Sequence, residues 1–212
     1  TSAACSACHS NHLAATAMRD REGANIAPFN LWQGTMMANA ARDPLWHAQV
    51  SAETQANPGH AAEIEAKCIR CHSPMASVNA LEAGEQPTMD TLYDHGSVDA
   101  IVGLDGVACA VCHQIEKNNL GQYESFSGGY RINQDRKIFG PHRNPAPGPM
   151  INHVDYTPTW GMHVTKAELC GTCHTLFTDP IRADGTPVEG VKFPEQTTFL
   201  EWKNSAYAGR EL

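Results

Sequence analysis

The sequence is poor in the side chains that normally build a protein core. Leu, Ile, Val and Phe make up 36 of its 212 residues, about 17%. A share below roughly 20%, combined with appreciable net charge, is typical of a disordered chain. The net charge is −8, yet the chain also has four Trp, five Tyr, seven Met and eight Cys, and it has no low-complexity tract. Something other than aliphatic side chains must therefore supply the core.

Long apolar runs and basic runs are also missing. No apolar stretch approaches the roughly 18 residues of a membrane-spanning helix, so the sequence predicts no membrane span. The 15 Lys and Arg residues are outnumbered by 23 Asp and Glu, and no basic run is longer than two residues. Nucleic-acid binding depends on a concentrated basic footprint for phosphates, so we expect no nucleic-acid partner.

The eight cysteines share one spacing. Each belongs to a C-x-x-C pair that is followed directly by His, and the four motifs cover residues 5–9, 68–72, 109–113 and 170–174. C-x-x-C-H is typical of covalent c-type haem attachment. Two thiols three positions apart lie about one helical turn apart, where they can bond the two vinyl groups of one porphyrin. The next residue then presents its imidazole to the iron.

The sequence therefore predicts four c-type haems as cofactors. The predicted haem-attaching residues are Cys5, Cys8, Cys68, Cys71, Cys109, Cys112, Cys170 and Cys173, and the predicted proximal iron ligands are His9, His72, His113 and His174. Zinc sites and disulfide frameworks do not require a His after every second Cys. Four apolar porphyrins also explain the scarcity of aliphatic residues. We expect a mainly α fold with extensive irregular loops and little sheet, forming a single haem-cored tetrahaem cytochrome c domain over residues 1–212.

Several local signals predict helices. Asp43 followed by Pro44 predicts an N-cap with Pro at the first helical position. Asn57-Pro58 repeats this pattern, and the next helix is expected to carry His60 into the second motif. Further expected features are a Thr165-x-x-Glu168 capping box, a last helix over residues 195–206, a small hairpin over 123–132 and an extended loop over the proline-rich residues 141–149.

Seven histidines lie outside the motifs: His12, His47, His60, His95, His142, His153 and His163. Bis-histidine ligation would use four of them as distal ligands, and His is the commonest metal-ligating side chain. His12 lies three residues after His9, on about the same face of an expected helix, so it would serve a different haem in this subunit or a neighbouring one. Methionine is the rival distal ligand and would raise the reduction potentials.

The motifs and their surroundings resemble a family of large bacterial multihaem c-type cytochromes. The stretches that carry the resemblance are "MMANAARDPLW", "EIEAKCIRCHSPMA", "DGVACAVCHQI", "FSGGYRI", "FGPH", "HVTKAELCGTCHTL" and "FPEQTTFLEW", which span about residues 36 to 202. The resemblance implies that His60, His153 and His163 are distal iron ligands. Longer relatives carry further haem motifs after an "FPEQ"-type segment, whereas this sequence stops at residue 212.

Size and haem count are also similar to those of the tetrahaem extracellular cytochromes that polymerise into nanowires, the OmcE-like group. That resemblance implies a homopolymer as the main partner, with His12 as the candidate ligand to a haem of the neighbouring subunit. Other redox proteins or extracellular acceptors would be further partners. Haem attachment follows export, and Thr1 lies close to the first motif. We therefore expect a mature exported chain, extracellular or at the cell surface, or alternatively periplasmic.

Three functions remain open from the sequence. The first is non-enzymatic electron transfer, either in a filament or as a discrete periplasmic or surface shuttle. The second is a reductase or oxidase of small nitrogen or sulfur compounds, which needs one five-coordinate haem. Its candidate site residues are His47, His95, His142 and Tyr156. The third is a haem-stapled scaffold protein.

Overall fold

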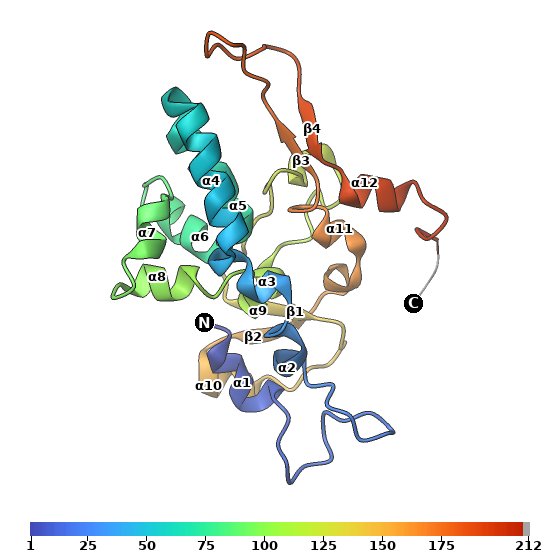
Figure 1. Ribbon diagram of the computed structural model, residues 1–212. Helices are drawn as coiled ribbons and strands as arrows, with labels where there is room; N and C mark the ends of the chain where they lie inside the picture. The colour runs from blue at the N-terminus through green and yellow to red at the C-terminus, as the bar shows by residue number, and fades with distance from the viewer. Residues whose placement is uncertain (210–212) are drawn as a thin grey trace. The chain divides into compact units, whose positions relative to one another are not determined.

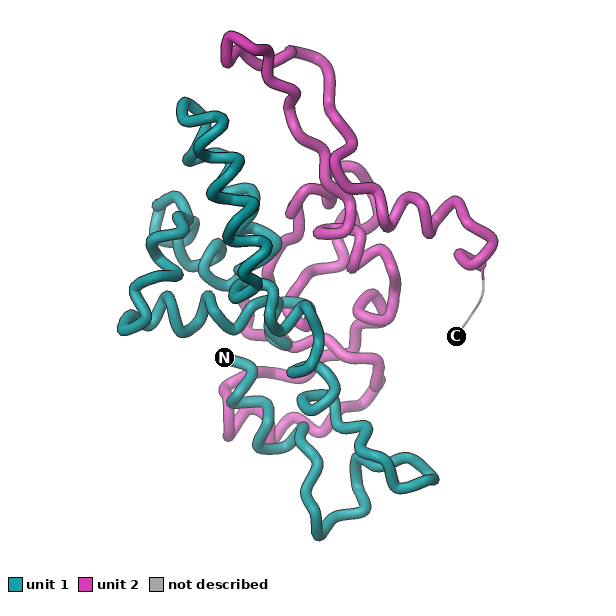
Figure 2. The backbone as a smooth tube through the Cα atoms, in the orientation of Figure 1, with its two compact units in different colours: residues 1–112 teal, residues 113–212 magenta. Residues whose placement is uncertain are grey.

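The computed structural model describes residues 1–209 and is mainly helical, with 46% helix and 10% strand (Figure 1). The expected mainly α class with little sheet is therefore confirmed. The chain divides into two compact units, Thr1–Cys112 and His113–Leu212 (Figure 2). The boundary falls inside a helix, α9 (Cys109–Gln114). The single tetrahaem domain stays a prediction, and its last three residues lie outside the described part of the chain.

The first unit consists of helices joined by turns and loops. Its α-helices are α1 (Ala3–His9), α2 (Pro28–Trp32), α3 (Met36–Asn39), α4 (Pro44–Ala56), α5 (Ala61–His72), α6 (Pro74–Glu82), α7 (Met89–Tyr93) and α8 (Val98–Gly103), and its 3-10 helices are η1 (Ala40–Arg42) and η2 (Pro58–His60). In Figure 1, α4 and α5 lie side by side and α6 to α8 gather beside them. No helix among residues 1–209 has the length and apolar character needed to cross a bilayer.

The start of α4 is confirmed. Pro44 is its first residue, and the Asp43 carboxylate accepts the Leu45 N–H at 3.0 Å, as an N-cap does. The second Asn-Pro signal gives a different result, because the Asn57 side chain makes no capping bond and the chain forms the short η2. His60 ends η2 and is followed directly by α5, so a helical segment does run from Pro58 through His60 to the second motif, but its first turn is a 3-10 turn.

A small apolar core holds the helices of the first unit together. It consists of Trp46, Val50, Ile69, Ala76, Met89 and Leu92, with Cys68 and Leu104 packed against it. Gly103 permits α8 to approach α7 and the start of α6 closely, because a Cβ at this position would lie 2.6 Å from Leu92 Cδ2 and 2.9 Å from Ser73 Oγ. The buried Ser73 hydroxyl donates to the Gly103 carbonyl at 2.9 Å.

The second unit has short helices and two small sheets. Its elements are η3 (Tyr123–Ser125), β1 (Lys137–Gly140), α10 (Gly148–Val154), β2 (Thr157–Trp160), η4 (Met162–Thr165), α11 (Ala167–Cys170), β3 (Leu176–Thr178), β4 (Phe193–Gln196) and α12 (Thr198–Lys203). β1 pairs with β2 in parallel, from Lys137 opposite Thr157 to Gly140 opposite Trp160. β3 and β4 are antiparallel, with an irregularity between Leu176 and Phe177.

Two local predictions in this unit are wrong. The hairpin over residues 123–132 is a 3-10 turn followed by two residues with positive φ, Ser127 at 55° and Gly128 at 78°. The N–H groups of Ser127 and Gly128 bond the carbonyls of Thr175 and Thr172, so they are not available to pair two strands within residues 123–132. The capping box also fails, because the Thr165 hydroxyl donates to the Met162 carbonyl within η4 and Lys166 is the N-cap of α11.

Two boundaries differ from those expected. The proline-rich loop ends before residue 148, since Pro149 occupies the first turn of α10, where the missing N–H costs no helical bond. The last helix is shorter than residues 195–206. Residues 195 and 196 belong to β4, and α12 ends at Lys203.

Candidate functional site

The local backbone of the four motifs agrees with the helical spacing that haem attachment needs. The first motif lies within α1, the second forms the last turn of α5, and the third begins α9. In the fourth motif only Cys170 is helical, at the end of α11, but the His174 N–H donates to the Cys170 carbonyl at 2.9 Å. The two thiols of each motif are therefore about one turn apart along a helix or helical turn.

The proximal His of the third motif is oriented by a strand of the same unit. His113 Nδ1 lies 2.6 Å from the carbonyl oxygen of Phe139 on β1. A carbonyl oxygen only accepts hydrogen bonds, so Nδ1 carries the proton and Nε2 keeps its lone pair. In metal-ligating histidines, a hydrogen bond from the ring nitrogen that does not bind the metal fixes the ring orientation and the tautomer, and the bond from His113 Nδ1 to the Phe139 carbonyl is of this kind.

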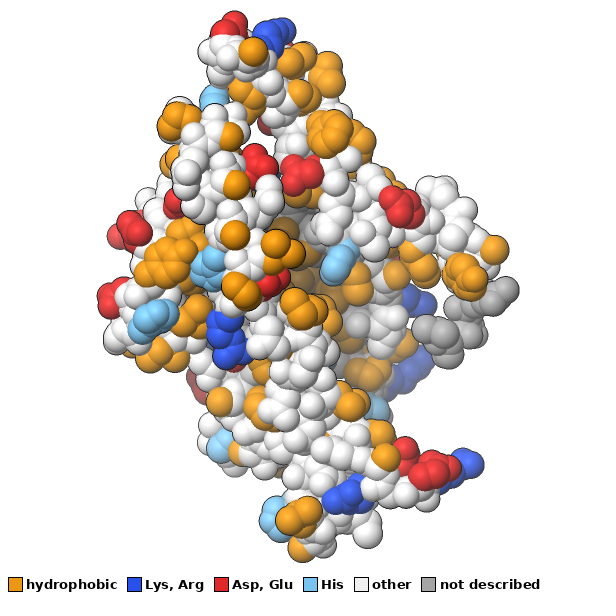
Figure 3. Space-filling view, in the orientation of Figure 1, with side chains coloured by type: hydrophobic (Ala, Val, Ile, Leu, Met, Phe, Trp, Pro, Cys, Tyr) orange, Lys and Arg blue, Asp and Glu red, His pale blue; other side chains and the backbone are white. Residues whose placement is uncertain are grey.

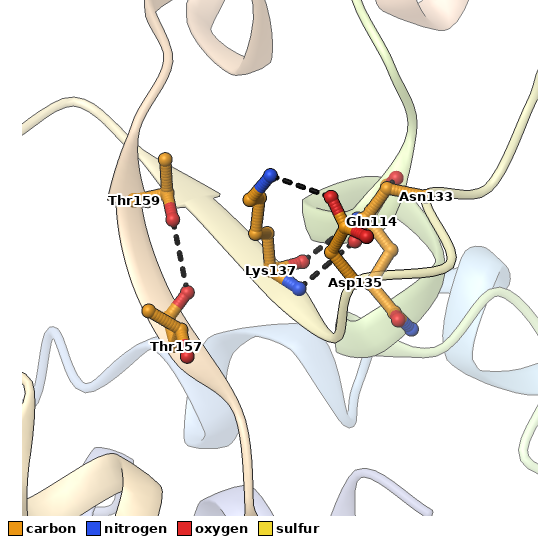
Figure 4. A network of polar contacts seen from close by, with 6 residues as sticks. All are labelled: Gln114, Asn133, Asp135, Lys137, Thr157 and Thr159. Atoms are coloured by element: carbon orange, nitrogen blue, oxygen red, sulfur yellow. Dashed lines mark hydrogen bonds and ion pairs between the residues drawn. The ribbon is translucent and has the colours of Figure 1, made fainter.

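A buried Asn side chain fixes β1 against the end of α9 (Figure 4). Asn133 is 6% exposed. Its Nδ2 donates to the Gln114 carbonyl at 3.0 Å and to the Lys137 carbonyl at 2.9 Å, while its Oδ1 accepts the Lys137 N–H at 2.9 Å. Gln114 follows His113 directly and Lys137 begins the strand that contains Phe139, so Asn133 sets the distance between the imidazole and its carbonyl partner.

The turn that replaces the expected hairpin binds the fourth motif. The Ser127 N–H donates to the Thr175 carbonyl at 2.8 Å, and the Gly128 N–H donates to the Thr172 carbonyl at 2.7 Å. On another side, the Phe199 N–H donates to the His174 carbonyl at 3.0 Å. The "FSGGY" stretch is therefore part of the support of the fourth motif.

The second motif is attached to the apolar core of the first unit. Ile69 is fully buried in that core. The ring of His72 stacks on Trp46, with centroids 4.7 Å apart and planes 2° from parallel. Trp46 Nε1 is buried and has no hydrogen-bond partner among residues 1–209. The Trp46 ring packed against one face of His72 restricts the orientations that this imidazole can take.

Two of the cysteine thiols, those of Cys5 and Cys170, are in environments that favour the protonated form. A side-chain hydrogen bond with Cys109 is the main cause that raises the pKa of the Cys5 thiol, and burial is the next largest cause. Burial also raises the pKa of Cys170. A reactive redox or catalytic cysteine needs a lowered pKa, so these two thiols do not resemble activated nucleophiles.

The environment of His12 differs from the expectation. The prediction that it shares a helix face with His9 is wrong, because α1 ends at His9 and Ser10 is already extended, with φ −101° and ψ 157°. His12 is exposed in the following loop, and its Nδ1 accepts the Ala14 N–H at 3.2 Å. That bond would have to open if Nδ1 were protonated and Nε2 bound iron.

The other candidate distal ligands occupy three different settings. His60 is half-buried at the end of η2, and His153 is exposed on α10. His163, in η4, donates from Nε2 to the Ile115 carbonyl at 2.8 Å and lies edge-on to Phe139, with ring centroids 4.8 Å apart. Binding of iron through Nε2 would require the His163 ring to leave that carbonyl. The ligand roles of all three stay predictions.

One candidate for an enzymatic site has a structural role. His47 Nε2 donates to the Ala41 carbonyl at 2.9 Å, so its Nδ1 accepts from the Tyr93 hydroxyl at 2.9 Å. Both ring nitrogens are therefore engaged within the first unit. His95 and His142 are exposed, and the Tyr156 ring lies 4.5 Å below the Arg136 guanidinium.

The chain exposes more surface than compact proteins of its mass do. A compact protein of 23.0 kDa exposes about 9,600 Å², and two separate compact proteins of half that mass expose about 11,600 Å² together. This chain exposes 13057 Å². Figure 3 shows hydrophobic side chains scattered over one face, and Leu13, Leu45 and Val98 are each more than 70% exposed. Bound porphyrin plates would cover such surface.

Sequence reasoning missed the residues that support the motifs. Asn133 and the Phe139 carbonyl act on the third motif, and Ser127 and Gly128 hold the fourth. Most of these contacts are made by backbone groups, which leave no signature in side-chain chemistry. The paired glycines of "FSGGY" are the one available signal, because positive φ at Gly128 is a backbone requirement.

Comparison of the chain with protein-family models, curated proteins and solved structures finds no significant match. Within residues 1–209, the side chains of His, Cys, Asp and Glu form no cluster of three or more that could hold a metal ion.

Proposed function

We propose that this chain is a tetrahaem c-type cytochrome that transfers electrons, with one haem attached to the cysteines of each motif. The observation that carries the proposal is the His113 ring. Its Nδ1–H donates to the Phe139 carbonyl, which leaves the Nε2 lone pair to bind iron from the same helix that presents Cys109 and Cys112. When bound, haem iron supplies one-electron transfer between its ferrous and ferric states.

Electron transfer fits the described residues better than catalysis does. A reductase or oxidase needs an open iron position with an acid–base group beside it. His47, a candidate for that group, has both nitrogens held by Tyr93 and Ala41. An electron carrier instead needs imidazoles held in fixed positions, which is what the Phe139 carbonyl does for His113.

Electron paramagnetic resonance of the oxidised protein separates the two functions. We expect low-spin ferric signals from all four haems, no change on adding cyanide, and reversible reduction in a spectroelectrochemical titration. A high-spin signal that cyanide converts to low spin would contradict pure electron transfer and favour the enzyme.

We further propose that copies of the chain assemble into an extracellular filament in which His12 serves a neighbouring copy. His12 is exposed in the loop after α1, next to Leu13, which is 94% exposed, so an approaching copy can reach its imidazole. The single hydrogen bond from the Ala14 N–H to His12 Nδ1 is long and exposed, so breaking it to let Nε2 bind the iron of a neighbouring copy costs little.

Electron microscopy of the purified protein tests the filament. We expect long regular filaments from the wild type and from His95→Ala, which removes another exposed imidazole. We expect discrete particles from His12→Ala. Discrete particles from the wild type would favour the shuttle, and filaments from His12→Ala would show that His12 is not the link between copies.

A further inference from the structure

Two motifs that are far apart in the sequence meet within the first unit. The backbone N–H groups of Cys5, in the first motif, and Cys109, in the third, both bond to Ser2, and the nearby Cys109 side chain raises the pKa of the Cys5 thiol. Both residues are first cysteines of their motifs. Cys5 lies inside α1 and Cys109 is the first residue of α9, so the contact joins two helices and not two neighbouring turns.

Ser2 holds these two helices together. Its carbonyl accepts the Cys5 N–H at 2.9 Å, and its hydroxyl accepts the Cys109 N–H at 3.0 Å. Its own N–H donates to the Asp105 carboxylate at 2.7 Å. Ser2 is 1% exposed, so these bonds are shielded from competing water. One buried residue therefore links the backbones of both cysteines.

We propose that the haems of the first and third motifs form one directly coupled pair, and that Ser2 is the residue that positions them. This inference rests on the proposed function. Each cysteine sulfur would be bonded to a carbon carried by its porphyrin, so two cysteines joined through the one buried residue Ser2 would hold the edges of their porphyrins near each other. One electron would then pass from the ferrous iron of one motif to the ferric iron of the other, without a change in bonds or protons. The second motif, between them in the sequence, is not needed for this step.

Circular dichroism in the haem absorption band tests the pairing, because closely packed haems give a two-signed band. We expect Ser2→Ala to lose a component of that band while the chain keeps four haems. Ser2→Thr retains the hydroxyl and should restore the component. Ser6→Ala is the matched control, since the one bond that the Ser6 hydroxyl, on the same helix, makes to the described part of the chain is to the Ala3 carbonyl at 2.7 Å.

Removing whole haems keeps the test decisive if Ser2→Ala folds poorly. We expect Cys5→Ala/Cys8→Ala and Cys109→Ala/Cys112→Ala each to lose the same component, so that the combined variant loses less than the sum of the two losses. Strictly additive losses, or a Ser2→Ala spectrum identical to that of Ser6→Ala, would overturn the pairing. A wild type without haem would instead refute the proposed function, and the haem content of each sample shows which claim has failed.

Discussion

Replacing Asn133 with alanine is expected to destabilise the second unit and to disturb the third motif. The change removes three hydrogen bonds, two donated by Nδ2 to the Gln114 and Lys137 carbonyls and one accepted by Oδ1 from the Lys137 N–H. At about 1 kcal/mol per bond, the loss is about 3 kcal/mol. For a chain of this size, 1 kcal/mol corresponds to roughly 2–4 °C in melting temperature, so we expect a decrease of about 6–12 °C.

Asn133→Asp sharpens this prediction. A carboxylate keeps the size of the side chain and can still accept the Lys137 N–H, but it cannot donate to either carbonyl. It would also place a buried negative charge beside two carbonyl oxygens, so we expect it to be at least as destabilising as alanine at neutral pH. Asn118→Ala is the matched control, because Asn118 is exposed and makes one long contact, 3.5 Å to Glu116. Such surface changes stay within about 0.5 kcal/mol.

Thermal unfolding followed by circular dichroism measures the stability of these variants, and the reduction potentials of the loaded protein report on His113. If the imidazole depends on Asn133 through the Phe139 carbonyl, Asn133→Ala shifts one of four potentials while Asn118→Ala shifts none. An Asn133→Asp protein as stable as the wild type would mean that the Nδ2 donors of Asn133 contribute nothing to stability.

Two further predictions concern the core of the first unit. Trp46→Ala should lower the free energy of unfolding by about 3–5 kcal/mol, because Trp46 is buried in the apolar core. Trp46→Phe should recover part of this loss, because it restores a ring against His72. Chemical denaturation of both variants measures the difference. Gly103→Ala should lower the free energy of unfolding by about 1–3 kcal/mol, because its Cβ would meet Leu92 Cδ2 at 2.6 Å. Gly59→Ala is the control, because a Cβ there would have open space. Equal stability of the Gly103→Ala and Gly59→Ala proteins would contradict the close packing at Gly103.

Local signals predicted local structure well where one residue acts on its near neighbours. Asp43 and Pro44 start α4 because the capping bond reaches only to Leu45. The same logic failed at Thr165, whose hydroxyl has a competing acceptor, the Met162 carbonyl, within reach in the preceding turn. Residues 141–149 were predicted correctly as loop except at their end, since proline is also compatible with the first turn of α10.

The helical backbone of the motifs could be predicted from the sequence, but their surroundings could not, and the haem-binding roles of the motif residues stay a prediction. C-x-x-C-H spacing is itself a local pattern, and the backbone agrees with it at all four places. The contact between Cys5 and Cys109 and the bond from His113 to Phe139 both join distant segments. Such pairings depend on tertiary packing, which spacing within a motif does not encode. The surroundings of the candidate distal ligands could not be predicted for the same reason: the partner of His163, the Ile115 carbonyl, lies far away in the sequence.

We expect each of the four motifs to attach one haem. The most direct test is the intact mass of the full chain under denaturing conditions, after production in a host that attaches c-type haems, together with its pyridine haemochrome spectrum. We predict a mass increase equal to four haems in the wild type and to three in Cys170→Ala/Cys173→Ala. A full chain that carries no covalent haem, or a variant whose haem content equals that of the wild type, would contradict this expectation.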